Sequence, residues 1–159
     1  MRGLNTLSDV IDLALGVEIA AAVAPIRQRR PEVVAHTQGV HDALFDGPAG
    51  RAFGRQRLAA IAAHVAALGE AKTLAAYYTE LAEGAGTESD SAGDGKLAAA
   101  LRHAVRLTEA PATSTHAHLE VLLAAGLSET DIVTVTQLVG FVNYQVRLLA
   151  GLALIGARS

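Results

Sequence analysis

The chain has 159 residues, of which 51% are hydrophobic and 4% aromatic, and its formal net charge is −3. This length suits one domain with one core, and the absence of a basic stripe predicts a protein that does not bind nucleic acid. The chain contains no cysteine, which excludes disulfides, cysteine-ligated metals and thiol nucleophiles together and agrees with a cytoplasmic location.

The amino-terminal half is predicted to be helical, with breaks at glycine and proline. Ser8 is a suitable N-cap for a first helix, and Pro31 fits the first position of a second. The segment 46–50, DGPAG, ends that second helix because it combines two glycines with a proline. Two more helices are expected at about 52–68 and 70–83, where apolar residues recur at helical spacing.

The carboxyl-terminal half begins with the low-complexity segment 84–95, GAGTESDSAGDG. Its composition predicts a flexible loop, which is either a solvated connector or a lid. A helix is expected at about 96–107, and the one after it ends with Gly126 in the C′ position. Ser128 and Asp131 then resemble a capping box that opens the last helical segment.

We therefore predict an all-α bundle of about six to seven helices, with residues 1–159 as a single domain. The long apolar stretch 133–157 raises the question of a membrane span. It carries Arg147 and three amide side chains near its middle, which would be costly in a bilayer. A buried helix of a protein that does not enter a membrane is the better interpretation.

Two stretches resemble a known family. The segment 55–68, RQRLAAIAAHVAAL, looks like the first helix of the alkylhydroperoxidase D-like, or carboxymuconolactone decarboxylase, superfamily. The segment 126–147, GLSETDIVTVTQLVGFVNYQVR, is similar to the closing helical segment of that family. With the helices between them, the resemblance covers roughly residues 30–156, and it points to a cysteine-free subgroup with the family's helical fold.

In the peroxidase members of that family, a glutamate is followed twelve residues later by Cys-x-x-Cys, and a histidine comes four residues after the second cysteine. The thiolates there reduce the peroxide, and the glutamate and histidine move protons. On this sequence the four positions fall on Ala59, Ala71, Leu74 and Tyr78. All four depart from the motif, so the resemblance implies the fold without thiol peroxidase activity.

Positions 71, 74, 75 and 78 share one helix face. Where the peroxidases keep a polar redox centre, this face consists of Ala71, Leu74, Ala75 and Tyr78. Two interpretations follow. The site is either filled with core atoms, or it is remodelled into an apolar pocket in which the Tyr78 hydroxyl is the hydrogen-bonding group.

A few polar residues are candidates for other chemistry. His64 and His118 could exchange protons, although each could equally be a structural histidine. Asn143 and Arg147 lie four residues apart on one helix face, where Arg147 could hold an anionic substrate or bind carbonyls or a carboxylate within the protein. On a helix, His116 and His118 point in different directions, so we expect no metal site. No nucleotide-binding motif is present, and we expect no cofactor.

The sequence leaves open whether the protein is an enzyme. The first hypothesis is a non-catalytic homo-oligomer, or a protein that binds a small organic molecule. The alternative is a cysteine-independent decarboxylase-type enzyme acting by acid–base chemistry on a lactone or small organic acid. It would use Arg147 to position the anion and Tyr78, His64 or His118 to move a proton, so it requires a pocket where these groups converge.

Overall fold

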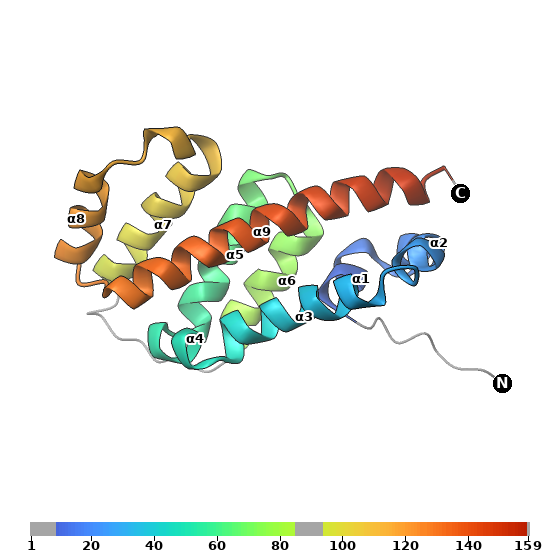
Figure 1. The fold of residues 1–159 in the computed structure, drawn as a ribbon, viewed down its shortest axis with the longest axis horizontal. Coiled ribbons are helices and arrows are strands. Elements are labelled where there is room, and N and C mark those ends of the chain that lie inside the picture. Colours follow the sequence, from blue (N-terminus) through green and yellow to red (C-terminus); the bar gives the residue numbers. More distant parts are fainter. Residues whose placement is uncertain (1–8, 85–93, 159) are drawn as a thin grey trace.

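The computed structural model describes residues 9–84 and 94–158, and every regular element in these ranges is a helix (Figure 1). The predicted all-α class is therefore confirmed. Ser8 and most of the predicted loop, residues 85–93, lie outside the described residues. In chain order the helices are α1 (Val10–Leu15), α2 (Val17–Arg27), α3 (Pro31–Asp46), α4 (Pro48–Phe53), α5 (Arg55–Leu68), α6 (Lys72–Glu83), α7 (Asp94–Glu109), a 3-10 turn (Pro111–Thr113), α8 (His116–Ala124) and α9 (Glu129–Gly156).

Glycines divide two of the predicted helices. Asp9 caps α1 through its side chain, which accepts hydrogen bonds from the backbone N–H groups of Ile11 at 2.9 Å and Asp12 at 3.0 Å. Gly16 then takes a φ of 76° and separates α1 from α2. Gly54, with a φ of 111°, splits the helix predicted at 52–68 into α4 and α5. Side chains other than glycine are disfavoured at such angles, so each of these glycines ends a helix.

The caps predicted around Gly126 are confirmed. Gly126 has a φ of 88°, and the N–H of Leu127 donates to the carbonyl of Leu122 at 3.1 Å, which is the bond of a Schellman motif. Ser128 and Asp131 exchange two hydrogen bonds: the Asp131 N–H donates to the Ser128 hydroxyl at 3.1 Å, and the Ser128 N–H donates to the Asp131 carboxylate at 2.8 Å. These local bonds fix the point where α9 begins.

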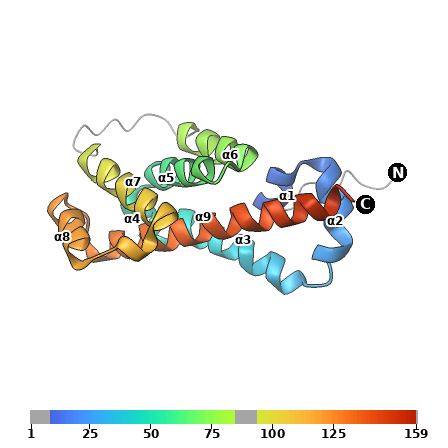
Figure 2. The same cartoon turned by 90° about the horizontal axis from the view of Figure 1, so that it is seen from above.

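Helix α9 runs the length of the molecule and organises the other helices around it (Figure 1). Seen from above, the α5–α6 pair lies on one side of α9 and α3 on the other, with α7 and α8 at one end and α1 and α2 at the opposite end (Figure 2). Helix α9 packs against α1, α2, α3, α4, α5, α7 and α8. It is long and apolar enough to pass a length-and-composition test for a membrane span, a test that the core helix of a soluble protein also passes.

The core lies where α9 meets the alanine-rich helix α5. Ala59, Ala62 and Ala66 of α5 are fully buried, and small side chains of this kind let helices approach closely while favouring the helix itself. One stripe of α9 is buried along most of the helix, and it contains Leu138, Val142, Gln145, Leu149 and Leu152.

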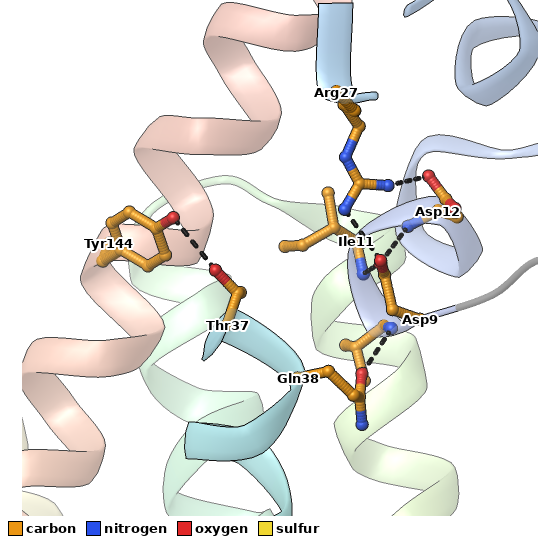
Figure 3. A network of polar contacts seen from close by, with 8 residues as sticks. Asp9, Ile11, Asp12, Arg27, Thr37, Gln38 and Tyr144 are labelled. Carbon is orange, nitrogen blue, oxygen red and sulfur yellow. Dashed lines mark hydrogen bonds and ion pairs between the residues drawn. The ribbon is translucent and has the colours of Figure 1, made fainter. Parts of the chain in front are cut away.

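A polar cluster joins the three amino-terminal helices (Figure 3). The guanidinium of Arg27, near the end of α2, donates to Asp9 at 2.8 Å and also bonds the Asp12 carboxylate. The Gln38 side chain of α3 accepts a hydrogen bond from the Val10 N–H at 3.1 Å. Because the Arg27 side chain is only 11% exposed, the charges of this cluster are largely shielded from water.

We predict that Arg27→Met destabilises the protein by about 3 kcal/mol, because it leaves two carboxylates together in a poorly solvated place. Urea unfolding measures the change. The matched control is Arg30→Met. Arg30 pairs with Glu32 at 3.7 Å, but its side chain is 69% exposed, so we expect a change below about 0.5 kcal/mol. Equal losses in the two variants would contradict this account.

Candidate functional site

The helix pair α5–α6 carries the positions at which the family motif was superposed. A tight turn joins the two helices. The N–H of Ala71 donates to the Ala66 carbonyl at 3.0 Å, and Glu70 takes a φ of 59°, a left-handed conformation that is strained for a side chain other than glycine. A Cβ on Gly69 would come within 2.7 Å of Val146 of α9. This close approach holds the turn against α9 and fixes where α6 starts.

Three of the four motif positions are in the core. Ala59 of α5 and Leu74 and Tyr78 of α6 are each 0% exposed. Ala71 directly precedes α6 and is partly buried against the same cluster, as is Ala75. Leu74 and Tyr78 therefore point into the protein, whereas Ala71 and Ala75 lie at the edge of the core. Core side chains fill the space at Leu74 and Tyr78.

The Tyr78 hydroxyl is held by a glutamine of α9. It donates to Oε1 of Gln145 at 2.7 Å, and the Gln145 side chain is fully buried. The Gln145 Nε2 group has no hydrogen-bond partner among the described residues. Burial raises the pKa of Tyr78 far above its usual range, although the bond to Gln145 opposes the shift. Tyr78 is therefore a neutral hydrogen-bond donor at any physiological pH.

A second polar group lies next to Tyr78, and the sequence analysis did not identify it. His41 of α3 is buried, and its Nε2 lies 3.0 Å from the hydroxyl of Tyr77. Its Nδ1 lies 3.2 Å from the Asp42 carboxylate, which also accepts a hydrogen bond from Gln38 at 2.7 Å. Because a carboxylate only accepts, Nδ1 carries the proton and Nε2 accepts the hydrogen bond from Tyr77.

The charges of this group follow from burial and pairing. Burial lowers the pKa of His41, and the hydrogen bond and charge of Asp42 oppose that shift. The hydrogen bond with His41 lowers the pKa of the Asp42 carboxyl, whereas burial raises the pKa of Tyr77. At neutral pH these three hydrogen-bonded groups are therefore a carboxylate (Asp42), a neutral imidazole (His41) and a neutral phenol (Tyr77).

Aromatic rings surround His41. Its ring centroid lies 4.8 Å from that of Phe45 and 6.3 Å from that of Tyr78, to which it is nearly parallel. The Tyr77 and Tyr78 rings meet edge to face at 5.1 Å. Phe45 and Tyr78 are fully buried, whereas Tyr77 is only partly covered. The polar chain therefore extends from the edge of the core, at Tyr77, into an aromatic cluster.

The predicted proton-transfer residues lie apart from one another. His64 is exposed on α5. His118 lies in the first turn of α8, and its Nδ1 accepts a hydrogen bond from the Thr115 N–H at 3.0 Å, which completes a capping box. His116 is exposed and lies 3.5 Å from Glu120. Among the residues that the structure describes, no three His, Asp or Glu side chains gather where they could hold a metal ion.

The predicted anion-binding pair has partners within the protein. The Arg147 guanidinium donates to the Asn143 backbone carbonyl at 3.0 Å, and the Asn143 amide donates to the Thr108 hydroxyl of α7 at 3.1 Å. Arg147 is exposed, whereas Gln145, two residues earlier, is buried. Arg147 and Tyr78 are therefore on different sides of α9.

Open grooves occur on the surface, and one of them reaches a motif position. It has a volume of about 420 Å³, lies between α1, the start of α6 and α9, and is lined by Leu15, Ala71, Lys72, Val146, Leu149 and neighbouring residues. A second groove of about 450 Å³ lies between α3 and α9. Neither groove is lined by Tyr78, His64, His118 or Arg147.

The fold resembles that of a solved structure. The crystal structure of an uncharacterized peroxidase-related protein from Silicibacter sp. TM1040 matches with a TM-score of 0.55 and 16% sequence identity, over 95% of this chain and 94% of that one. At this identity the likeness shows the fold alone. No protein-family model matches the chain, and no curated protein does.

The Tyr78–Gln145 bond predicts that substitutions at these two positions have non-additive effects on the free energy of unfolding. Tyr78→Phe leaves both polar atoms of the buried Gln145 amide without partners, and we expect it to cost about 2 kcal/mol. Adding Gln145→Met removes the stranded amide, so the double variant should be more stable than the sum of the two single losses implies. Urea unfolding of the wild type, the two single variants and the double variant measures this non-additivity. Additive losses would contradict it, and Tyr144→Phe, at an exposed tyrosine, is the control.

His41 predicts how stability depends on pH. Burial holds its folded-state pKa below the ordinary value of 6.5, so the unfolded chain takes up the proton first as the pH falls. The contribution of His41 is then complete above about pH 7 and decreases on acidification below about 6.5. Burial lowers the pKa of His103 as well, so both histidines act in the same direction.

We therefore expect the free energy of unfolding to decrease as the pH is lowered from about 7.5 to about 5. His41→Gln should make that decrease shallower, although some slope remains because of His103. Urea unfolding at a series of pH values provides the measurement. His64→Gln, at an exposed position of α5, is the matched control, and a slope unchanged by His41→Gln would show that the imidazole is not shielded.

Proposed function

We propose that the chain is an alkylhydroperoxidase D-like protein that works without thiol chemistry, as a homo-oligomer in the cytoplasm. The structural likeness to a peroxidase-related protein supports an alkylhydroperoxidase D-like fold. The family assignment beyond the fold rests on the resemblance of segments 55–68 and 126–147. The proposed loss of peroxidase activity rests on the composition and on the motif positions.

One observation carries the proposal. Leu74 and Tyr78, at the positions of the second cysteine and the histidine, are 0% exposed. The Tyr78 hydroxyl, which is the polar atom on this face, is bonded to Gln145 at 2.7 Å. A peroxide needs both a nucleophile and space to approach it. At Leu74 and Tyr78 this face offers neither, because the chain has no cysteine and both side chains are buried in the core.

Apolar side chains on the surface support assembly with further copies. Val121 on α8 is 56% exposed, and Val133 and Leu154 on α9 are 55% and 67% exposed. Exposed apolar side chains of this size can become buried in a subunit interface. A mean hydropathy of +0.31 is high for a 16.4 kDa soluble chain, in agreement with part of the surface being covered in an assembly.

Binding of a small organic molecule is a second candidate, and one observation favours it. The groove between α1, α6 and α9 opens at Ala71, and its lining is mainly apolar, with Glu70, Lys72 and Thr73 as its polar members. Such a groove suits a small, partly apolar molecule. The acid–base alternative has less support, because none of the residues it requires lines either of the two surface grooves.

The proposal predicts that the full-length chain does not catalyse peroxide reduction by dithiols. We expect hydrogen peroxide or an organic hydroperoxide to be consumed at the rate of the protein-free control when a dithiol such as dihydrolipoamide is supplied. A cysteine-containing peroxidase of the same fold serves as the positive control. Dithiol-dependent turnover by the purified chain would overturn the proposal.

The proposed homo-oligomer predicts a particular mass in solution. Size-exclusion chromatography with light scattering should give a multiple of the 16.4 kDa chain mass. Val121→Asp and Leu154→Asp each replace an exposed apolar side chain by a charged one, and we expect at least one of them to reduce that mass. Ala98→Asp, at an exposed position of α7, is the control. A monomeric wild-type protein at all concentrations would contradict the assembly.

A further inference from the structure

Tyrosines are the principal side chains from which this chain can lose a single electron. The sequence has three tyrosines, no tryptophan and no cysteine, and its one methionine is Met1. A phenol that loses one electron becomes strongly acidic and releases its hydroxyl proton. The ease of oxidation therefore depends on whether a base stands within hydrogen-bond distance to accept that proton.

The three tyrosines differ in this respect. The Tyr78 hydroxyl faces the amide oxygen of Gln145 at 2.7 Å, and the Tyr144 hydroxyl lies 3.2 Å from the Thr37 hydroxyl (Figure 3). Neither an amide nor an alcohol holds an extra proton at neutral pH. The Tyr77 hydroxyl lies 3.0 Å from Nε2 of His41, and a neutral imidazole nitrogen is a much stronger base than an amide or alcohol oxygen.

We propose that Tyr77, hydrogen-bonded to His41, is a one-electron donor to oxygen-centred radicals such as peroxyl radicals. In the step, the electron passes from the phenol to the peroxyl radical, which becomes a hydroperoxide anion and takes a proton from the solvent. The O–H bond of Tyr77 breaks, and an N–H bond forms at Nε2 of His41. The products are one hydroperoxide, a neutral Tyr77 phenoxyl radical and a His41 imidazolium.

Burial lowers the pKa of His41, but the hydrogen bond and charge of Asp42 oppose that shift and support its role as proton acceptor. Its Nδ1–H donates to Asp42 at 3.2 Å, so the imidazolium would form next to a carboxylate. Gln38 holds that carboxylate by a hydrogen bond of 2.7 Å. Of the other charged groups that act on His41, Asp46 favours the protonated ring and Arg55 opposes it. Arg55 is itself paired with Asp46 at 3.1 Å, which weakens its effect.

Exposure also selects Tyr77 over its neighbour. Tyr77 is partly covered, so a small radical can reach the edge of its ring, whereas Tyr78 is fully buried. The two ring centroids are 5.1 Å apart, close enough for an electron to pass between them. Because the Tyr78 hydroxyl faces an amide, it has no acceptor for its proton, and the radical therefore resides on Tyr77. The activity uses no thiol and is independent of the proposed assembly.

The test exposes the full-length protein to peroxyl radicals from a water-soluble azo initiator in aerated buffer. Freeze-quenched samples are examined by electron paramagnetic resonance, and oxidised tyrosines are located by peptide mass mapping. We expect a phenoxyl signal in the wild type, its loss in Tyr77→Phe and its retention in Tyr144→Phe, the matched control. An equal signal in Tyr77→Phe, or oxidation mapped mainly to Tyr144, would overturn the proposal.

The role of His41 has its own measurement. His41→Gln keeps a hydrogen-bond acceptor but cannot hold the proton, so we expect the radical yield to fall several-fold. In the wild type the yield should also decrease on acidification, as His41 becomes protonated in advance, and in His41→Gln this pH dependence should vanish. If that variant does not fold, Asp42→Asn, at a side chain that is 58% exposed, should lower the yield. A yield and pH profile unchanged by the variant tested would refute the role of His41.

Discussion

The burial of one stripe of α9 against the helices around it, α5 above all, is the constraint on which the rest of the structure depends. The stripe repeats at intervals of four and three residues, and it is apolar except for one glutamine: Leu138, Val142, Gln145, Leu149 and Leu152. The alanines of α5 allow the helices to approach closely, and the Gly69 turn presses against Val146. Because α9 also contacts the helices at both ends of the molecule, its position determines theirs.

Gln145 explains how the fold accommodates a polar group at the centre of this packing. A buried amide without a partner is costly, and the Tyr78 hydroxyl satisfies one of its two polar atoms. The bond joins α9 to the buried face of α6. At that face this chain has a fixed pair of neutral groups inside a packed core. Such an arrangement stabilises one alignment of α6 and α9 and leaves the Tyr78 hydroxyl without contact to solvent.

The chain of Asp42, His41 and Tyr77 borders the same core but has a different character. It begins at an exposed carboxylate and ends at a phenol at the edge of the aromatic cluster. Through Gln38 it is also joined to α1, whose Val10 N–H donates to that side chain. Polar groups of α1, α3 and α6 are therefore linked by hydrogen bonds. Within this network, the phenol of Tyr77 is partly exposed to solvent.

Several features could be predicted from the sequence because their causes are local. The absence of any thiol is a matter of composition, the helical class follows from periodicity, and the caps at Gly126 and Ser128 depend on residues a few positions apart. Gln145 also left a signal, since it interrupts an otherwise apolar stripe. The breaks at Gly16 and Gly54 were missed because a glycine in an apolar pattern is compatible with either a continuous helix or a positive φ.

Only the tertiary structure decided which polar groups meet. His41 and Tyr77 are 36 residues apart, and Tyr78 and Gln145 are 67 apart. A hydrogen bond between helices requires both to be rotated and placed to within a fraction of an ångström, and that placement results from the packing of the whole core. The sequence by itself therefore determined what this protein lacks and which elements it forms, whereas the packing of α3, α6 and α9 determined which side chains act together.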